Sequence, residues 1–284
     1  QMNYFRKACC ICAQNFRKWV TNYRIWVLFI LIAIFINSYT KEISLFAEAV
    51  HYRMSPWLFP FLYGQKYMKY ILFSGVLLLF CDAPFLDEEQ PYVIIRSGRK
   101  FWSVGQVFYI VTASAAYFLY IVMMSILLNL GNMEWNPDWG KVLGTLGTVN
   151  VGNMVSYKIS VSSKIVTFFT PLQAMWFTFL LSWLTGIFLG LLIYACNVLF
   201  ANRFIGVLFA AFFVFFDTVV RNHMTLLWFS PVSWSALDNI GIGERLARPD
   251  ITYVLTAYGV LILALCTIIF MKSRKQPIEV MPPI

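Results

Sequence analysis

Charged residues are scarce in this 284-residue chain. Asp, Glu, Lys and Arg make up 12% of the residues, whereas 60% are hydrophobic, and soluble domains carry about 25% charged residues. A soluble fold of this length could not hide so much apolar surface, because a large share of any folded surface stays exposed to solvent. The composition excludes an ordinary soluble domain and predicts an all-α integral membrane protein with several spans.

Histidine is nearly absent, with only His51 and His223, and both fall in expected loops. The motifs HExxH, GxSxG and GxxxxGK[ST] do not occur, so nothing indicates a zinc hydrolase, a serine hydrolase or a P-loop ATPase. Glu88–Glu89 followed by Arg96 only weakly resembles the paired-glutamate motif of intramembrane prenyl-protein peptidases, and its glutamates lie outside the expected spans. We therefore expect no enzyme site, metal or cofactor on this chain.

The chain has only six cysteines, and its 13 acidic residues are outnumbered by 22 basic ones. Cys9 and Cys12 form a lone CxxC without a second pair or a nearby histidine, which predicts reduced thiols rather than a zinc site or a disulfide framework. The net charge is +9. No basic stripe with interleaved aromatic residues lies on a soluble module, so we expect no nucleic-acid partner.

Long apolar runs are what the chain does contain. They predict six spans in one transmembrane domain, residues 23–284, at about 23–38, 68–85, 107–130, 172–199, 204–220 and 251–271. No small-residue cleavage site follows the first run, which favours a span over a cleavable signal peptide. Residues 1–22 mix basic and aromatic side chains at helical spacing, which predicts an interfacial amphipathic helix, with a frayed tail as the alternative.

The segments between the spans are uneven in length. Pro56–Gly64 is apolar but is followed by Lys66 and Lys69, which are costly at membrane depth, so we expect this run at the outer interface. Residues 131–170 form a long loop, in which a strand pair over Val155–Val166 and an irregular cap both remain open. Basic residues flank the first span and follow the last, which predicts that both termini are cytoplasmic and that lipids are partners.

Two small patterns lie within the spans. Gly186 and Gly190 form a GxxxG pair that predicts close helix packing. Asp217 and Arg221 stand four residues apart in the fifth run, so they can pair on one helix face, and a proton site is the alternative reading. No internal repeat relates residues 1–140 to residues 141–284, which disfavours a secondary transporter.

The connector between the second and third spans is unusually charged for its length. Acidic residues come first and basic residues follow, with apolar side chains between them. This order suits a short helix pressed into a groove of a soluble partner, while a loop touching lipid is the alternative.

The layout resembles the membrane permease subunits of type-2 ABC exporters, of the small kind found in Gram-positive bacteria. The resemblance rests on the amphipathic start around Phe16–Trp19, the six spans, the run RSGRKFWSVGQ entering the third span, and SPVSW at Ser230–Trp234 before the sixth. It implies that residues 86–100 are a cytoplasmic coupling helix seated in a separate ATPase subunit, which binds ATP and Mg. The coupling residues would be Asp87, Glu88, Glu89, Tyr92, Ile95, Arg96, Arg99 and Lys100.

The resemblance further implies a re-entrant loop on the outer side over residues 222–240, with gate candidates Trp228, Phe229, Pro231 and Trp234. It also implies a location in the bacterial cytoplasmic membrane and a working unit of two permeases, identical or paralogous, with two ATPases. The expected function is therefore export of an amphipathic cargo, such as a peptide, an antimicrobial or a lipid-like compound. An ion-coupled carrier and a non-transporting membrane sensor or scaffold are the alternatives.

Overall fold

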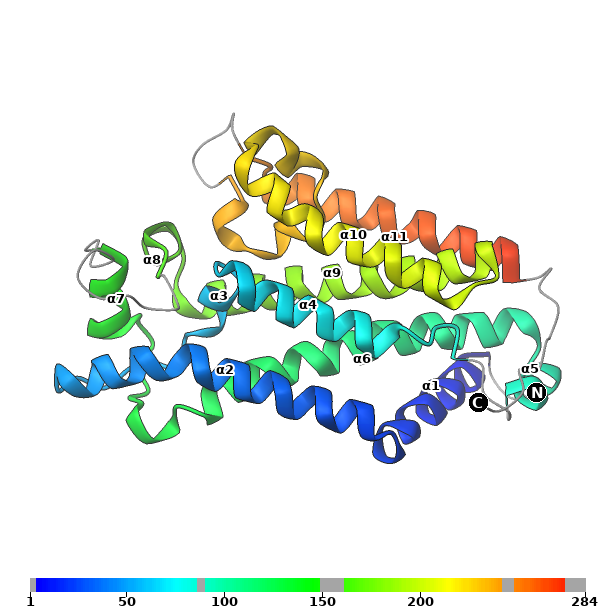
Figure 1. Cartoon of the computed structure of the whole chain (residues 1–284), viewed down its shortest axis with the longest axis horizontal. Coiled ribbons are helices and arrows are strands. Elements are labelled where there is room, and N and C mark those ends of the chain that lie inside the picture. Colours follow the sequence, from blue (N-terminus) through cyan, green and yellow to red (C-terminus); the bar gives the residue numbers. More distant parts are fainter. Residues whose placement is uncertain (1–3, 86–89, 149–160, 242–247, 274–284) are drawn as a thin grey trace.

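The structure is a computed structural model of the chain, and it describes residues 4–85, 90–148, 161–241 and 248–273 (Figure 1). The described part is helical, without a named strand. Its main elements are α1 (Tyr4–Thr21), α2 (Tyr23–Ala49), α3 (Phe59–Leu62), α4 (Lys66–Phe80), α5 (Gln90–Ser97), α6 (Arg99–Leu127), α7 (Gly140–Thr148), α8 (Ser163–Phe168), α9 (Pro171–Phe200), α10 (Arg203–Asn222) and α11 (Ile251–Ser273). Short 3-10 turns are η1 (Leu130–Asn132), η3 (Met224–Phe229), η4 (Ser233–Ser235) and η5 (Leu237–Asn239).

Five of the described helices are long and apolar enough to cross a membrane, namely α2, α6, α9, most of α10 and α11. They confirm the expectation of a multi-pass, all-helical chain. The expected span at 68–85 differs, because α4 has 15 residues and rises only about 22 Å, less than the roughly 30 Å of a hydrocarbon core. Residues 81–85 continue it as turns that contain a cis Ala83–Pro84 bond.

The helix at the centre of the bundle is α9. Its apolar window is 72% buried, against 22% for α2 and α11, which fits a sequence that is hydrophobic on every side. Gly186 and Gly190 face α6, and a Cβ there would lie 2.7 Å from Phe118 Cε2 and from Ile110 Cγ2, respectively. These two glycines therefore allow the side chains of α6 to approach the α9 backbone closely.

Several helices extend beyond the expected spans. The first long helix continues to Ala49, so residues 39–49 are helical rather than a connecting loop. The third begins at Arg99 instead of 107, directly after Gly98, whose φ of 88° suits glycine and separates α5 from α6. The long loop holds α7 and α8, and residues Ser163–Val166, expected as part of a strand or an irregular cap, are helical. The first part of that run, residues 155–160, lies outside the described residues.

Pro56–Gly64 also differs from the expected interfacial run. Within it, the four residues of α3 and the adjoining Tyr63 are almost completely buried. This run packs against α9 and α6, so its hydrophobicity serves the core of the bundle. The two ends of the bundle also differ, since α1 and α5 lie at one end and α7 and α8 at the other (Figure 1).

Candidate functional site

The connector contains a short helix, α5, at one end of the bundle (Figure 1). Tyr92 and Ile95 are each 76% exposed, whereas Ile94 is buried. A helix of eight residues therefore has one apolar face packed inward and a second, large apolar surface turned outward. Such an exposed pair on a short element is typical of a surface that a partner covers.

The inner face of α5 is held by α1 and by the first turn of α6. Ile11, Ile94 and Trp102 form one small buried cluster, with Val93 packed against it. Gly105 on α6 makes this contact close, because a Cβ at that position would lie 2.8 Å from Ile11. A force applied to α5 would therefore reach both α1 and α6 through packed side chains.

Hydrogen bonds connect α1 to α6 beyond that cluster. The Asn15 amide donates to Gln106 Oε1 at 2.7 Å, and the Trp19 indole donates to the Tyr109 hydroxyl at 2.8 Å. Cys12 is buried, its thiol lies 3.3 Å from Thr112 Oγ1, and burial raises the pKa of that thiol. The amphipathic start is thus a helix bonded to the bundle, which rules out a frayed tail.

A buried ion pair lies at the first turn of α4, the end of this helix that is farther from the connector. Lys69 Nζ lies 2.6 Å from Asp217 Oδ1, and both side chains are no more than 1% exposed. Arg221 Nε lies 3.6 Å from Asp217 Oδ2 on the same helix. The expected Asp217–Arg221 contact exists, but the shorter and fully buried contact is with Lys69.

The same carboxylate anchors the segment between α10 and α11. Ser233 Oγ donates to Asp217 Oδ1 at 2.6 Å and also contacts Ser230 Oγ. Asp217 therefore binds α10 to α4 and to η4. Because removing one partner from a buried ion pair costs about 3–5 kcal/mol, this junction fixes how the three elements sit.

The four gate candidates occupy different environments within this segment. Pro231 and Trp234 are buried, Trp228 is half-buried and Phe229 is exposed. The Trp234 ring packs on Tyr258 at a centroid distance of 5.2 Å, and the Tyr258 hydroxyl donates to the Pro231 carbonyl at 2.6 Å. The segment folds back onto the bundle and contacts α9 through η4 and η5.

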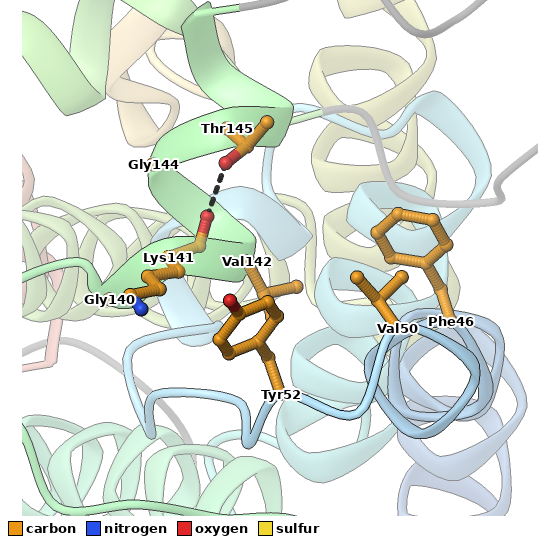
Figure 2. Close-up of a pocket in the computed structure, with 8 residues that line it drawn as sticks. All are labelled: Phe46, Val50, Tyr52, Gly140, Lys141, Val142, Gly144 and Thr145. Carbon is orange, nitrogen blue, oxygen red and sulfur yellow. Dashed lines mark hydrogen bonds between the residues drawn. The ribbon is translucent and has the colours of Figure 1, made fainter.

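Two cavities flank α2. One, of about 610 Å³, lies at the α7 end and is lined by Phe46, Val50, Tyr52, Gly140, Lys141, Val142, Gly144 and Thr145 (Figure 2). The Lys141 ammonium sits 4.6 Å from the centre of the Tyr52 ring, and Phe46 and Val50 lie on the other side of that ring (Figure 2). An apolar wall with one cation suits an amphipathic molecule with an anionic group. The other cavity, at the α1 end, is lined by aliphatic and aromatic side chains.

The remaining predicted coupling residues are only partly placed. Asp87, Glu88, Glu89 and the side chain of Arg96 lie outside the described residues, while Arg99 and Lys100 are exposed at the start of α6. Sequence reasoning missed Lys69 as a partner of Asp217. The sequence did contain a sign of this pairing. A lysine within an apolar run needs an acidic partner at the same depth, and Asp217 is the acid within the fifth apolar run.

The six cysteines are free thiols. Among the described residues, no cluster of three or more His, Cys, Asp or Glu side chains could hold a metal ion. Searches of protein-family models, curated proteins and solved structures find no match to this chain.

Proposed function

We propose that this chain is the membrane permease subunit of an ATP-driven exporter of the type-2 ABC kind. A separate ATPase, carrying ATP and Mg, docks on α5, and a second permease copy or a paralogue completes the unit. The cargo is an amphipathic peptide, antimicrobial or lipid-like molecule. The chain itself has no enzyme site in this proposal, because the ATPase supplies the chemistry.

The observation that carries the proposal is the exposed apolar pair Tyr92 and Ile95 on a short helix whose other face is packed into the bundle. A soluble partner that covered this apolar pair would remove it from water, and this favours docking over the alternative of a loop that touches lipid. Movement of α5 passes to α6 through Trp102 and to α1 through Ile11, so docking there can reorient a long helix.

The proposal includes six membrane crossings, with α4 as a short, enclosed one. Its neighbours α2, α9 and α10 surround it, and Lys69 within it is neutralised by Asp217. Basic residues beside the first and last apolar helices favour a bacterial cytoplasmic membrane orientation with both termini inside. The connector α5 then faces the cytoplasm, where an ATPase is available.

The direct experiment is to purify the chain from its host membranes and identify any co-purifying P-loop ATPase. A variant with Arg96, Arg99 and Lys100 changed to Glu should lose that ATPase while keeping its own fold. ATP-dependent transport by the reconstituted complex, absent from the chain alone, completes the test. Cargo transport by the chain alone would contradict the proposal.

A second candidate function is an ion-coupled carrier, and the buried Lys69–Asp217 pair favours it. Intramembrane charges often mark ion or proton pathways. Under that function, Asp217→Asn abolishes transport and changes at α5 have no effect. Under the exporter proposal, changes at α5 stop transport because the ATPase no longer binds, and Asp217→Asn acts through stability.

A further inference from the structure

Three cysteines stand close together on α1, and the proposed function uses none of them. Within this helix Cys9 is half-buried, Cys10 is exposed and Cys12 is buried. Residues three apart on a helix lie on one face, with their Cβ atoms about 5–6 Å apart. Cys9 and Cys12 therefore share the face of α1 that packs on the bundle, whereas Cys10 lies on the exposed face.

The thiols of Cys9 and Cys12 are near neighbours. Burial raises the pKa of the Cys12 thiol, and the nearby Cys9 thiol raises it further. The spacing of the pair is too wide for a disulfide in an intact helix, because the Cβ atoms of a disulfide lie about 3.5–4.5 Å apart. A metal ion held between the two sulfurs adds two metal–sulfur bonds, of about 2.3 Å each for zinc, and so spans the wider separation.

The number of ligands limits which metal ion fits. Zinc sites in proteins almost always have four ligands, and among the described residues no group of three or more His, Cys, Asp or Glu side chains could hold a metal ion. Thiolate ligands favour Cu(I), zinc and iron–sulfur clusters, and of these only Cu(I) is stable with two ligands. The pair therefore fits Cu(I).

The surroundings of Cys12 suit a thiolate as well as a thiol. Its sulfur lies 3.3 Å from Thr112 Oγ1 on α6. The Thr112 hydroxyl donates to the carbonyls of its own helix, at 2.9 Å from Phe108 O and 3.2 Å from Tyr109 O, so the neutral thiol is the donor to Thr112. When the thiol loses its proton, the Thr112 hydroxyl can turn and donate to the sulfur, a hydrogen bond of the kind that orients metal ligands.

The charge of α1 also favours such a complex. A Cu(I) ion bound by two thiolates carries one negative charge, because two protons leave the thiols when the ion binds. Between Tyr4 and Thr21, α1 contains four basic residues and no Asp or Glu. A helix with this excess of positive charge favours the thiolate form of its cysteines.

We propose that Cys9 and Cys12 together bind one Cu(I) ion, with Thr112 as a positioning residue for the Cys12 thiolate. Binding forms two copper–sulfur bonds and releases two protons, and neither copper nor sulfur changes its oxidation state. The bound ion holds the turn of α1 that contains Ile11, which packs against α5. The site is separate from the outer face of α5 and does not depend on the exporter proposal.

Anaerobic titration of the purified full chain with Cu(I), in competition with the chelator bicinchoninate, tests the proposal. The unaltered chain should take one Cu(I) from the chelator, and X-ray absorption should show two sulfur ligands. Cys9→Ser and Cys12→Ser should each abolish this binding. Cys10→Ser is the matched control, because it removes the neighbouring thiol on the exposed face of the same helix, and it should bind like the unaltered chain.

The role of Thr112 has its own test. Thr112→Val removes the hydroxyl and leaves both thiols, so we expect the Cu(I) affinity to fall by about 10–100-fold while the two sulfur ligands remain. Thr112→Ser restores a hydroxyl and should recover most of the affinity. Unchanged affinity in Thr112→Val would contradict the positioning role.

Three results would overturn the metal site itself. Failure of the unaltered chain to take Cu(I) from the chelator would show that the pair is not a site. Binding by Cys9→Ser as tight as that of the unaltered chain would place the ion elsewhere, even if Cys12→Ser fails to fold. Loss of binding in Cys10→Ser would assign the ion to a different set of thiols.

Discussion

Two regions of the molecule place side chains where their polarity is unusual. The outer face of α5 exposes apolar residues, and the junction around Asp217 buries charged ones. At α5, two large apolar residues are turned outward at the end of the bundle. At Asp217, a carboxylate and a lysine are turned inward among apolar helices. The first arrangement leaves surface for a partner to cover, and the second is complete within the chain. The comparison separates the proposed docking element from a structural junction.

This comparison predicts the largest stability effect at the junction. Asp217→Ala leaves Lys69 buried without its carboxylate, so we expect a loss of about 3–5 kcal/mol in the free energy of unfolding, measured by denaturation in detergent. Replacing both residues with apolar ones, Asp217→Leu with Lys69→Met, should recover most of that loss. A single variant as stable as the unaltered chain would show that the pair does not hold the junction.

The second-largest loss of stability is expected where α9 packs closely on α6. Gly190→Leu forces a side chain against Ile110, whose Cγ2 would lie 2.7 Å from the new Cβ, so we expect a loss of about 1–3 kcal/mol. Gly259→Leu on α11 is the matched control, because no atom lies within 4 Å of the Cβ added there. Equal stability of the two variants would contradict the role of the glycine pair in helix packing.

Substitutions on the outer face of α5 should have the opposite pattern of effects. They should change the stability of the chain little and weaken its binding to the ATPase strongly. Tyr92→Asp and Ile95→Asp should change the free energy of unfolding by no more than about 0.5 kcal/mol, as exposed substitutions usually do. Binding of the ATPase should weaken at least about tenfold, which corresponds to 1.4 kcal/mol. Trp135→Asp, also exposed but outside the connector, is the control and should bind normally.

The smallest effect concerns the attachment of α1. Cys12 is buried and Cys10 is exposed, and burial raises the pKa of the Cys12 thiol. A raised pKa lowers the thiolate fraction at neutral pH, so maleimide should label Cys10 much faster than Cys12. Raising the pH should speed labelling at Cys12. Equal rates at pH 7 would mean that α1 leaves the bundle in solution.

The sequence allowed the membrane class, the helical start and five of the six expected long apolar helices to be predicted, because each depends on composition and local periodicity. It could not place Lys69, since the pairing joins residues 148 positions apart and depends on how α4 packs. The run Pro56–Gly64 is expected at the interface because Lys66 and Lys69, which follow it, are costly at membrane depth. The structure pairs Lys69 with Asp217, which removes that argument for Lys69.

Buried and exposed apolar residues also look alike in the sequence. Pro231 and Trp234 have the same apolar character as Phe229, yet only Phe229 is exposed. Tyr258 and Thr185 decide the difference, because their hydroxyls connect α11 and α9 beneath the segment. At the connector the charged residues were expected to carry the contact, whereas the described geometry directs attention to Tyr92 and Ile95.

The central claim is that a soluble ATPase covers the outer face of α5. A photo-crosslinking amino acid placed at Tyr92 in host cells tests it most directly, with the same group at Trp135 as the control. We expect a covalent adduct between position 92 and a P-loop ATPase, and none from position 135. Adducts from position 92 that contain only lipid or a second copy of the chain would contradict the claim.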